Sequence, residues 1–398
     1  MLEGKTDMMR KIQMFLLLVA SLVTPLVLAQ EKPRNERLNL PDIPGYMTLK
    51  ADFHLHTVFS DGHVWPTFRV KEAQLDGLDV ISLTEHIDYE GYPKELAYQR
   101  ERAYAIALEA AAKTEVLVIR GVEISPRVPP YHHNALFIKN VDQIPYDYMK
   151  DTQHTFVMKE NIKRSELMAP FLEVEKQGGM VFYNHPSYKW WDTKDTLLFT
   201  DFHQELLDKG ILGGVEVANS GRYNPIAHEL AETYNLTLFS NSDEHYDIAR
   251  RYQNSHRPMT LVFAKEKTEA AIQDAILNRR TLAYFREYLV GRFPEADAFF
   301  KASISVTVEK GKSKYASILK VHLSNTTDIP YRIRCKTPYV IEDLPLGQLF
   351  LPPNETTTIV LNPVWKFPTQ LTLEVVVENM LISPDEALKT TLEIPINE

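Results

Sequence analysis

Between about residues 49 and 285, short apolar runs of strand length alternate with stretches in which apolar residues recur at helical spacing. This alternation is typical of repeated βα units, whose strands pair in a parallel sheet. The runs that predict strands cover residues 49–54, 80–84, 116–121, 135–138, 180–183, 214–218, 237–239 and 260–263. We therefore expect an α/β domain.

The helices between these strands follow from the same pattern. Residues 95–113 carry alanine and leucine at helical spacing, and residues 165–177 form a helical pattern that ends at Gly178-Gly179. A third helix is predicted at residues 268–278, where the side chain of Thr268 can cap the first turn.

The pattern changes at about residue 301. From there to the end, short β-rich runs follow one another without helical patterns, and turn signals such as Ser324-Asn325 separate them. These runs cover residues 302–309, 316–323, 331–336, 356–361 and 370–378. Such spacing is typical of a β-sandwich, and we expect a smaller all-β domain after the α/β domain.

The first 29 residues have the pattern of a secretory signal peptide. Arg10 and Lys11 form a charged head, an apolar run covers residues 12–28, and small residues precede Gln30. The alternative is a transmembrane anchor, but the run contains Ser21, Thr24 and Pro25 and is short for a membrane span. We expect cleavage, no stable membrane anchor afterwards, and a periplasmic or secreted protein.

The domain organisation predicted from these patterns has four segments. They are a signal peptide at 1–29, a linker or arm at 30–46, an α/β domain at 47–296 and a β-sandwich at 297–398. A length of 398 residues suits a barrel of about 250 residues with a smaller partner.

Composition narrows the classes of function. A hydrophobic fraction of 44% and a charged fraction of 24% describe an ordinary globular chain. The net charge of -9 argues against nucleic acid as a partner, because binding to phosphates requires a basic surface. The single cysteine, Cys335, excludes an intrachain disulfide and a cysteine-built zinc site. Any metal must therefore be bound by His, Asp and Glu.

Side chains able to bind metals stand at the ends of the predicted strands. They are His54, His56, Glu85, His86, Glu123, His132, His133, His185, Glu216, Asp243, Glu244 and His245. In a barrel, the carboxyl ends of the strands meet at one mouth. Residues i and i+2 of a strand share a face, so His54 and His56 can bind one ion. Five further histidines, at positions 154, 203, 228, 256 and 322, are interpreted as structural or exposed.

These motifs stand in the order of the PHP superfamily, the polymerase and histidinol phosphatase phosphoesterases, which the chain resembles from about residue 49 to 285. The resemblance is carried by His54-Leu55-His56-Thr57, Ser60-Asp61-Gly62, Thr84-Glu85-His86, Gly121-Val122-Glu123, His132 with Asn134-Ala135-Leu136, Asn184-His185-Pro186 and Ser242-Asp243-Glu244-His245. It implies a distorted (βα)7 TIM-like barrel with three divalent ions of zinc, manganese or iron.

The resemblance also implies how the ligands divide. His54, His56, Glu123 and Asp243 would hold one ion, Glu123 would bridge to a second ion held by His132 and His185, and Asp61, His86 and His245 would hold the third. Two departures are Glu85, where many members have Asp, and Glu244, where a small residue is common. Of the neighbours His132 and His133, we choose His132 as the ligand from its distance to Asn134-Ala135-Leu136.

Clustered divalent ions suit phosphoester hydrolysis, because they neutralise phosphate oxygens and activate a bridging hydroxide as the nucleophile. The sequence therefore predicts a phosphoric monoester or diester hydrolase acting on small phosphoesters. Candidate substrate-binding residues stand on loops near the strand ends and metal motifs: Arg222, Lys189, Tyr188, Trp190 and Tyr131. His63 and His133 are candidate proton donors to the leaving oxygen, and Arg222 is a candidate for charge stabilisation.

Two other functions compete. An amidohydrolase also begins with His-x-His on a barrel strand, but it normally has a bridging lysine, and here Glu123 takes that role in the resemblance. A binding protein that uses the barrel as a scaffold would have lost metal ligands, and none is lost. Ester preference, metal identity, oligomeric state and the role of the β-rich domain stay open.

Overall fold

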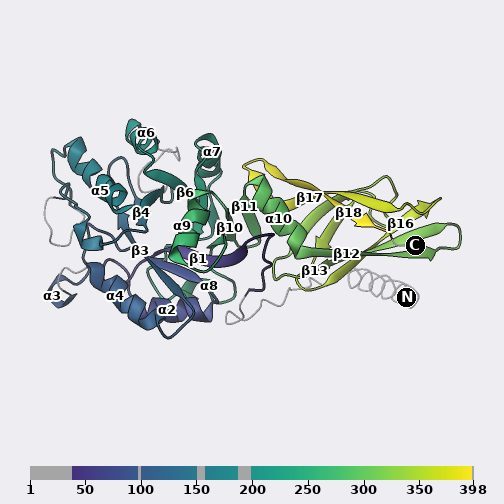
Figure 1. The fold of residues 1–398 in the computed structure, drawn as a ribbon, viewed down its shortest axis with the longest axis horizontal. Helices are drawn as coiled ribbons and strands as arrows, with labels where there is room; N and C mark the ends of the chain where they lie inside the picture. The colour runs from purple at the N-terminus through teal and green to yellow at the C-terminus, as the bar shows by residue number, and fades with distance from the viewer. Residues whose placement is uncertain (1–37, 97–99, 150–156, 187–198, 397–398) are drawn as a thin grey trace, which may run out of the picture. The chain divides into compact units, whose positions relative to one another are not determined.

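The computed structural model describes residues 38–96, 100–149, 157–186 and 199–396, drawn in colour in Figure 1. The predicted signal peptide and the first residues of the predicted linker lie outside these ranges. Among the described helices, none has the length and apolar character needed to cross a membrane.

Seven strands form the α/β part, in the order in which they neighbour one another. They are β1 (Met47–Leu55), β2 (Val80–Leu83), β3 (Leu117–Ile124), β4 (His133–Leu136), β5 (Met180–Tyr183), β6 (Leu212–Asn219) and β8 (Thr237–Asn241). A bridge between Leu55 and Glu244 brings the chain after β8 back beside the end of β1. The arrangement is the expected α/β TIM-like barrel.

One strand departs from the expected parallel sheet. β4 is antiparallel to both β3 and β5, whereas the other neighbouring pairs among these seven strands are parallel. Only residues 125–132 join β3 to β4, and a connection that short, without a helix, cannot return the chain to the start of a parallel strand.

Helices follow the barrel strands, as Figure 1 shows. They are α2 (Pro66–Leu75), α3 (Pro93–Leu96), α4 (Arg100–Ala111), α5 (Arg164–Gln177), α6 (Asp201–Asp208), α7 (Pro225–Thr233), α8 (Ala249–Tyr252) and α9 (Glu269–Leu277), with a 3-10 turn η1 (Val141–Gln143) and a short strand β7 (Arg222–Tyr223). The helices predicted at 165–177 and 268–278 are present, and the Thr268 hydroxyl accepts from the backbone N–H of Ala271.

Three strands and a helix lead out of the barrel. β9 (Met259–Ala264) is antiparallel to β1, and β10 (Thr281–Phe285) and β11 (Tyr288–Gly291) form a hairpin beside it. The predicted strand 260–263 therefore exists, but in an antiparallel layer. α10 (Phe293–Ser303) is continuous across the boundary predicted between residues 296 and 297, so the helix belongs to both predicted segments.

The C-terminal part is the expected β-sandwich. One sheet has β12 (Ile304–Lys312), β13 (Ser317–Asn325) and β16 (Thr356–Val364); the other has β14 (Tyr331–Lys336), β15 (Gln348–Leu351), β17 (Gln370–Ser383) and β18 (Glu386–Pro395). Inward residues alternate with exposed ones along β14, which places Ile333 and Cys335 in the core with Leu319 and Val375.

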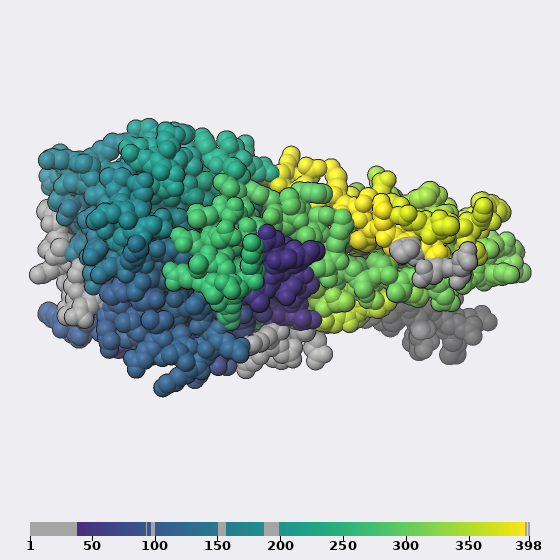
Figure 2. All heavy atoms as spheres, in the orientation of Figure 1, coloured from purple at the N-terminus to yellow at the C-terminus, as the bar shows by residue number. Residues whose placement is uncertain are grey.

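The β-sandwich and the barrel share a sheet, because β17 pairs in parallel with β11. Buried Asn379 stabilises this joint: its Nδ2 donates to the carbonyls of Glu287 (2.7 Å) and Pro330 (2.8 Å), and its Oδ1 accepts from Arg332 N (3.0 Å). The described end of the predicted linker is also packed here, since Asn39 N donates to Asp328 Oδ2 at 2.6 Å. Figure 2 shows this purple segment against green residues.

We expect acid to destabilise the fold, because two histidines of the barrel are buried in the neutral form. Burial lowers the pKa of His203 to about 4, and burial with nearby Arg292 lowers the pKa of His228 to about 4. In the unfolded chain these histidines have a pKa of about 6.5, so the unfolded state binds protons at a higher pH than the folded state does. The free energy of unfolding therefore falls as the pH is lowered from about 6.5 to about 4.

We expect His203→Phe to remove about 2–3 kcal/mol of the difference in unfolding free energy between pH 7.5 and pH 4.5. Urea unfolding at the two pH values measures this difference in the wild type and in the variant. Equal pH sensitivity of the two proteins would show that His203 is not kept neutral by burial.

Candidate metal centre

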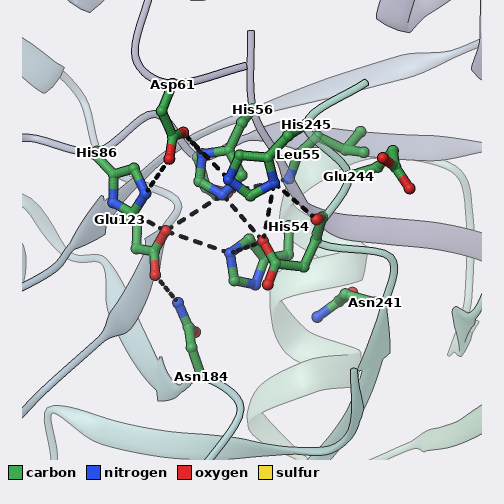
Figure 3. A network of polar contacts seen from close by, with 12 residues as sticks. His54, Leu55, His56, Asp61, His86, Glu123, Asn184, Asn241, Glu244 and His245 are labelled. Carbon is green, nitrogen blue, oxygen red and sulfur yellow. Dashed lines mark hydrogen bonds and ion pairs between the residues drawn. The ribbon is translucent and has the colours of Figure 1, made fainter. Parts of the chain in front are cut away.

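The nine side chains expected to bind metal meet at the strand ends of the barrel. Figure 3 labels His54, His56, Asp61, His86, Glu123 and His245 among them. The nine side chains form four overlapping groups whose possible ligand atoms lie within 4.8 Å of one another: His56, Asp61, His86 and His245; His54, Glu123 and His185; His54, His56 and Asp243; and His86, Glu123 and His132. Residues separated by as many as 191 positions in the chain are thus brought together by the barrel.

Glu123, near the end of β3, is the centre of the cluster. Its Oε2 lies 3.4 Å from His54 Nε2, 3.3 Å from His56 Nε2 and 3.2 Å from His86 Nδ1, and its Oε1 lies 2.8 Å from His132 Nδ1 and 3.7 Å from His185 Nε2. Asn184 Nδ2 donates to Oε1 at 2.9 Å, as Figure 3 shows. One buried carboxylate therefore faces five imidazoles.

Two further carboxylates flank this centre. Asp243 Oδ1 lies 3.2 Å from His54 Nε2 and 3.3 Å from His56 Nε2. Asp61 Oδ1 lies 3.2 Å from His245 Nε2, and its Oδ2 lies 3.4 Å from His86 Nε2. Both carboxylates approach ring nitrogens that point into the same space.

The grouping differs from the division that the resemblance implies, most clearly at His132 and His185. His132 groups with Glu123 and His86, and His185 groups with Glu123 and His54; among the described residues no group contains both His132 and His185. Both histidines nevertheless face Glu123 Oε1, and the centres of their rings lie 5.3 Å apart.

Several buried atoms of the cluster make no hydrogen bond. They are His54 Nε2, His56 Nε2, Asp61 Oδ1 and Glu123 Oε2. Buried polar atoms are nearly always hydrogen-bonded, yet these acceptors and ring nitrogens face one another. A divalent cation would satisfy nitrogen and oxygen ligands together, so these residues fit the metal ions that the resemblance implies.

The charges of the cluster suit the same ions. Burial alone would raise the pKa of Glu123, but His86, His132 and His54 hold that pKa well below its usual range. Burial is likewise outweighed at Asp243, whose pKa is lowered by His54 and His56, and at Asp61, whose pKa is lowered by His86 and His245. All three carboxylates are therefore ionised, as metal binding requires.

The backbone is strained at three positions of the cluster. Asp243 has φ 52°, His185 has φ 27°, and Tyr131, directly before His132, has φ 63°. Residues other than glycine rarely adopt positive φ, and such strain persists where the surrounding structure enforces it, often at functional sites. Tight turns after β5 and β8 thus aim two of the expected ligands.

Sequence reasoning placed Glu216 at a strand end but assigned it no role. In the structure its Oε1 lies 2.9 Å from His54 Nδ1 and accepts from Asn241 Nδ2, while Oε2 accepts from His185 N at 2.8 Å and Asn219 Nδ2 at 2.9 Å. Glu216 therefore orients His54 so that Nε2 points into the cluster, as carboxylates commonly do for metal-binding histidines.

Replacing Glu216 with Gln is expected to weaken metal affinity about 10- to 100-fold, because His54 loses its charged partner. Titration of the metal-free protein with Zn²⁺ or Mn²⁺ measures the affinity. Glu229→Gln, on exposed α7, is the matched control. Unchanged affinity in Glu216→Gln would contradict this orienting role.

Other supporting residues had little or no signal in the sequence. Arg69 is fully buried, and its guanidinium donates to the carbonyls of His56 (2.9 Å), Glu244 (2.7 Å) and Tyr246 (2.7 Å). It therefore ties the end of β1 to the loop after β8. Only the tertiary structure shows that one side chain of α2 reaches both.

Glu85, a departure from the resembled family, supports the turn that carries Asp61. Its carboxylate accepts from the hydroxyls of Thr57 and Ser60, each at 2.5 Å, and from Thr57 N at 3.1 Å. Glu244 lies beside the cluster, but its side chain is directed away from it in Figure 3, and its Oε1 accepts from Tyr246 N at 3.1 Å. Both residues support loops.

The proton-donor role predicted for His133 needs correction. The side chain has no exposed surface, its ring stacks on Tyr183 at 4.9 Å, and it packs against Phe171 and His203. Burial lowers its pKa well below the usual value. Alternation along β4 turns this side chain into the core behind the strand, where it cannot reach a substrate.

The other candidate residues for proton transfer and substrate binding differ in exposure and in their neighbours. His63 is exposed beside His245, whose carbonyl accepts from His63 N at 2.7 Å, and its ring stacks on Tyr246 at 4.3 Å. Arg222 is exposed on β7, opposite Asn219, whose side chain contacts Asp243. Tyr131 is half-buried next to His132. Lys189, Tyr188 and Trp190 lie outside the described residues.

A barrel whose strand ends gather histidines and carboxylates in this way defines a metal-binding α/β domain. The PHP domain family matches residues 52–289, more than half of the 398 residues, and the chain belongs to this family. An Ig-like domain family matches residues 304–393, within the β-sandwich.

Two proteins illustrate the similarity. A crystal structure from Bacteroides vulgatus, described as a two-domain protein containing a predicted PHP-like metal-dependent phosphoesterase, is 33% identical, with a TM-score of 0.78 over 91% of this chain and 100% of that chain. An uncharacterised protein of Methanocaldococcus jannaschii is 38% identical over 84 residues, which are 21% of this chain and 36% of that protein. The chain thus matches about a third of that relative's length.

Proposed function

We propose that this protein is an exported metal-dependent phosphoesterase that hydrolyses small phosphomonoesters, phosphodiesters or both. The observation that carries the proposal is the buried cluster around Glu123, in which Glu123 Oε2 faces the Nε2 atoms of His54 and His56 and none of these atoms has a hydrogen bond. Membership of the PHP family and the similarity to a two-domain protein with a predicted phosphoesterase support the same reaction class.

The site would hold three divalent ions of zinc, manganese or iron. His54, His56 and Asp243 would hold one, Asp61, His86 and His245 another, and Glu123 would join these positions to a third near His132 and His185. When bound, such ions neutralise phosphate oxygens and lower the pKa of a coordinated water toward about 7.

Residues at the rim would bind and orient the substrate. Exposed Arg222 follows β6 and is placed beside Asn219, which reaches Asp243, so its guanidinium can pair with a phosphate oxygen. Half-buried Tyr131 borders His132 and offers a ring to the ester group. These positions hold the phosphate over the cluster.

The first test is hydrolysis of p-nitrophenyl phosphate and bis-p-nitrophenyl phosphate by the chain beginning at Gln30, the form expected after signal cleavage. Elemental analysis of the same protein counts the ions, and His54→Ala is the control. Activity that disappears in His54→Ala, with about three ions per wild-type chain, supports the proposal. Protein without metal, or full metal without phosphoester hydrolysis, would overturn it.

His63 is the remaining candidate for the proton donor to the leaving oxygen. It is exposed at the rim and held by its backbone bond to His245 and its stack on Tyr246. His63→Gln is expected to lower kcat about 100-fold with metal content intact, because a positioned acid contributes about that factor.

Steady-state kinetics and elemental analysis of the variant test this role, since kcat should fall while the metal content stays that of the wild type. His322→Gln, on β13, is the matched control and should keep the wild-type kcat. An unchanged kcat in His63→Gln would remove the residue from the mechanism.

A further inference from the structure

One end of the β-sandwich gathers aromatic and basic side chains. Lys312, Ser317 and Val364 form one row across β12, β13 and β16, so the turn at 313–316 and the segment 365–367 leave the sheet at the same end. We call residues 310–316 and 364–367 the sandwich end. The sheet register, and not proximity in the chain, brings its two segments together.

Large rings at this end are open to solvent. Trp365 is 89% exposed and Tyr315 is 85% exposed, the two highest exposures among the large hydrophobic residues of the described chain. Phe367, two residues after Trp365, is half-buried against the sandwich core. Rings of this size that stay outside the core commonly mark a surface that binds another molecule.

All charged side chains in the two segments of the sandwich end are positive. Its segments contain Lys310, Lys312, Lys314 and Lys366 and no acidic residue, in a chain whose net charge is -9. Lys314 Nζ lies 5.2 Å from the centre of the Tyr315 ring, and Lys310 Nζ lies 5.7 Å from the centre of the Phe367 ring. Ammonium groups and rings are therefore interleaved on one surface.

We propose that the sandwich end binds reversibly to an anionic phospholipid bilayer. Trp and Tyr rings prefer the boundary between lipid headgroups and acyl chains, and lysines beside them are attracted to the negative surface. An apolar groove for a peptide is not needed, because a bilayer accepts rings that protrude from a turn. This proposal does not depend on the proposed phosphoesterase activity. For a phosphoesterase, binding to the bilayer would place the enzyme at a membrane surface.

The test is co-sedimentation of the chain beginning at Gln30, which lacks the apolar segment 12–28, with vesicles of phosphatidylcholine alone or with 30% phosphatidylglycerol. We expect binding only to the anionic vesicles, and weaker binding at high salt. Lys312→Glu/Lys314→Glu should lower the affinity at least about tenfold, since each lysine near an anionic surface contributes about a fivefold factor. Tyr315→Ser/Trp365→Ser should lower it by a similar factor.

Two control variants test whether a loss of binding is specific to the sandwich end. Phe293→Ser and Lys389→Glu change an exposed ring and an exposed lysine elsewhere and should bind as the wild type does. Thermal melting shows whether each variant is folded. Absence of binding by the folded wild type, or binding that Tyr315→Ser/Trp365→Ser leaves unchanged, would overturn the proposal.

A charged polymer is the other class of partner. Dextran sulfate and vesicles are therefore compared with the same variants. Binding to dextran sulfate that depends on the lysines but not on the rings, without binding to vesicles, would identify a soluble polyanion as the partner and overturn the bilayer proposal.

Discussion

Glu123→Gln is expected to abolish phosphoester hydrolysis, with a loss of at least about 1000-fold in kcat/KM, and to release bound metal. The carboxylate is 1% exposed and faces five imidazoles, and its Oε2 has no hydrogen bond. Gln offers one neutral oxygen and an N–H₂ group that repels a cation. The variant would lose several kcal/mol of charge stabilisation in the transition state. Each loss of about 1.4 kcal/mol lowers the rate tenfold.

Kinetics with p-nitrophenyl phosphate and elemental analysis of the same preparation measure both effects. Glu166→Gln is the matched control, because this carboxylate lies at the start of α5, away from the cluster, and accepts from Lys159 Nζ and from the backbone N–H of Lys163. If Glu123→Gln kept its metal and its rate, the cluster would not be the catalytic centre.

Arg257→Met is expected to lower the free energy of unfolding by about 3–5 kcal/mol, because it leaves buried charges without a partner. The guanidinium is fully buried and bonds to Asp76 Oδ2 at 2.9 and 2.8 Å and to Asp52 Oδ2 at 3.2 Å. Asp52 also accepts from Ser242 Oγ at 2.6 Å. The network therefore holds β1 against the strand end that carries Asp243.

Urea unfolding followed by circular dichroism measures the change. Lys267→Met is the control: its pair with Asp79, at 3.2 Å, is partly exposed, and we expect a loss of no more than about 1 kcal/mol. A comparable small loss in Arg257→Met would show that the buried pair does not stabilise the fold.

The pattern of the sequence was enough to predict the class of fold. Periodicity located the eight strands later found as β1–β6, β8 and β9 and the helices α5 and α9, because local burial determines the period of apolar residues. It did not predict the direction of β4, nor the hairpin of β10 and β11. Strand direction depends on how a connection crosses the sheet, which no local period records.

The candidate ligands were also accessible from the sequence. His54 and His56 share a face of one strand, and the other expected ligands follow strand ends, so a barrel must bring them to one mouth. The role of His133 was wrong for a related reason. His132, directly before β4, faces the cluster as expected, whereas His133, the first residue of β4, packs into the core behind the strand.

The supports of the site depended on the tertiary structure alone. Arg69 on α2 reaches carbonyls after β1 and β8, and Glu216 on β6 holds His54 and the backbone of His185. Nothing in the spacing of these residues indicates their partners, because the contacts join segments far apart in the chain. Local residue types determined which chemistry the chain can perform; long-range packing decided which side chains orient it and which surface of the β-sandwich stays exposed.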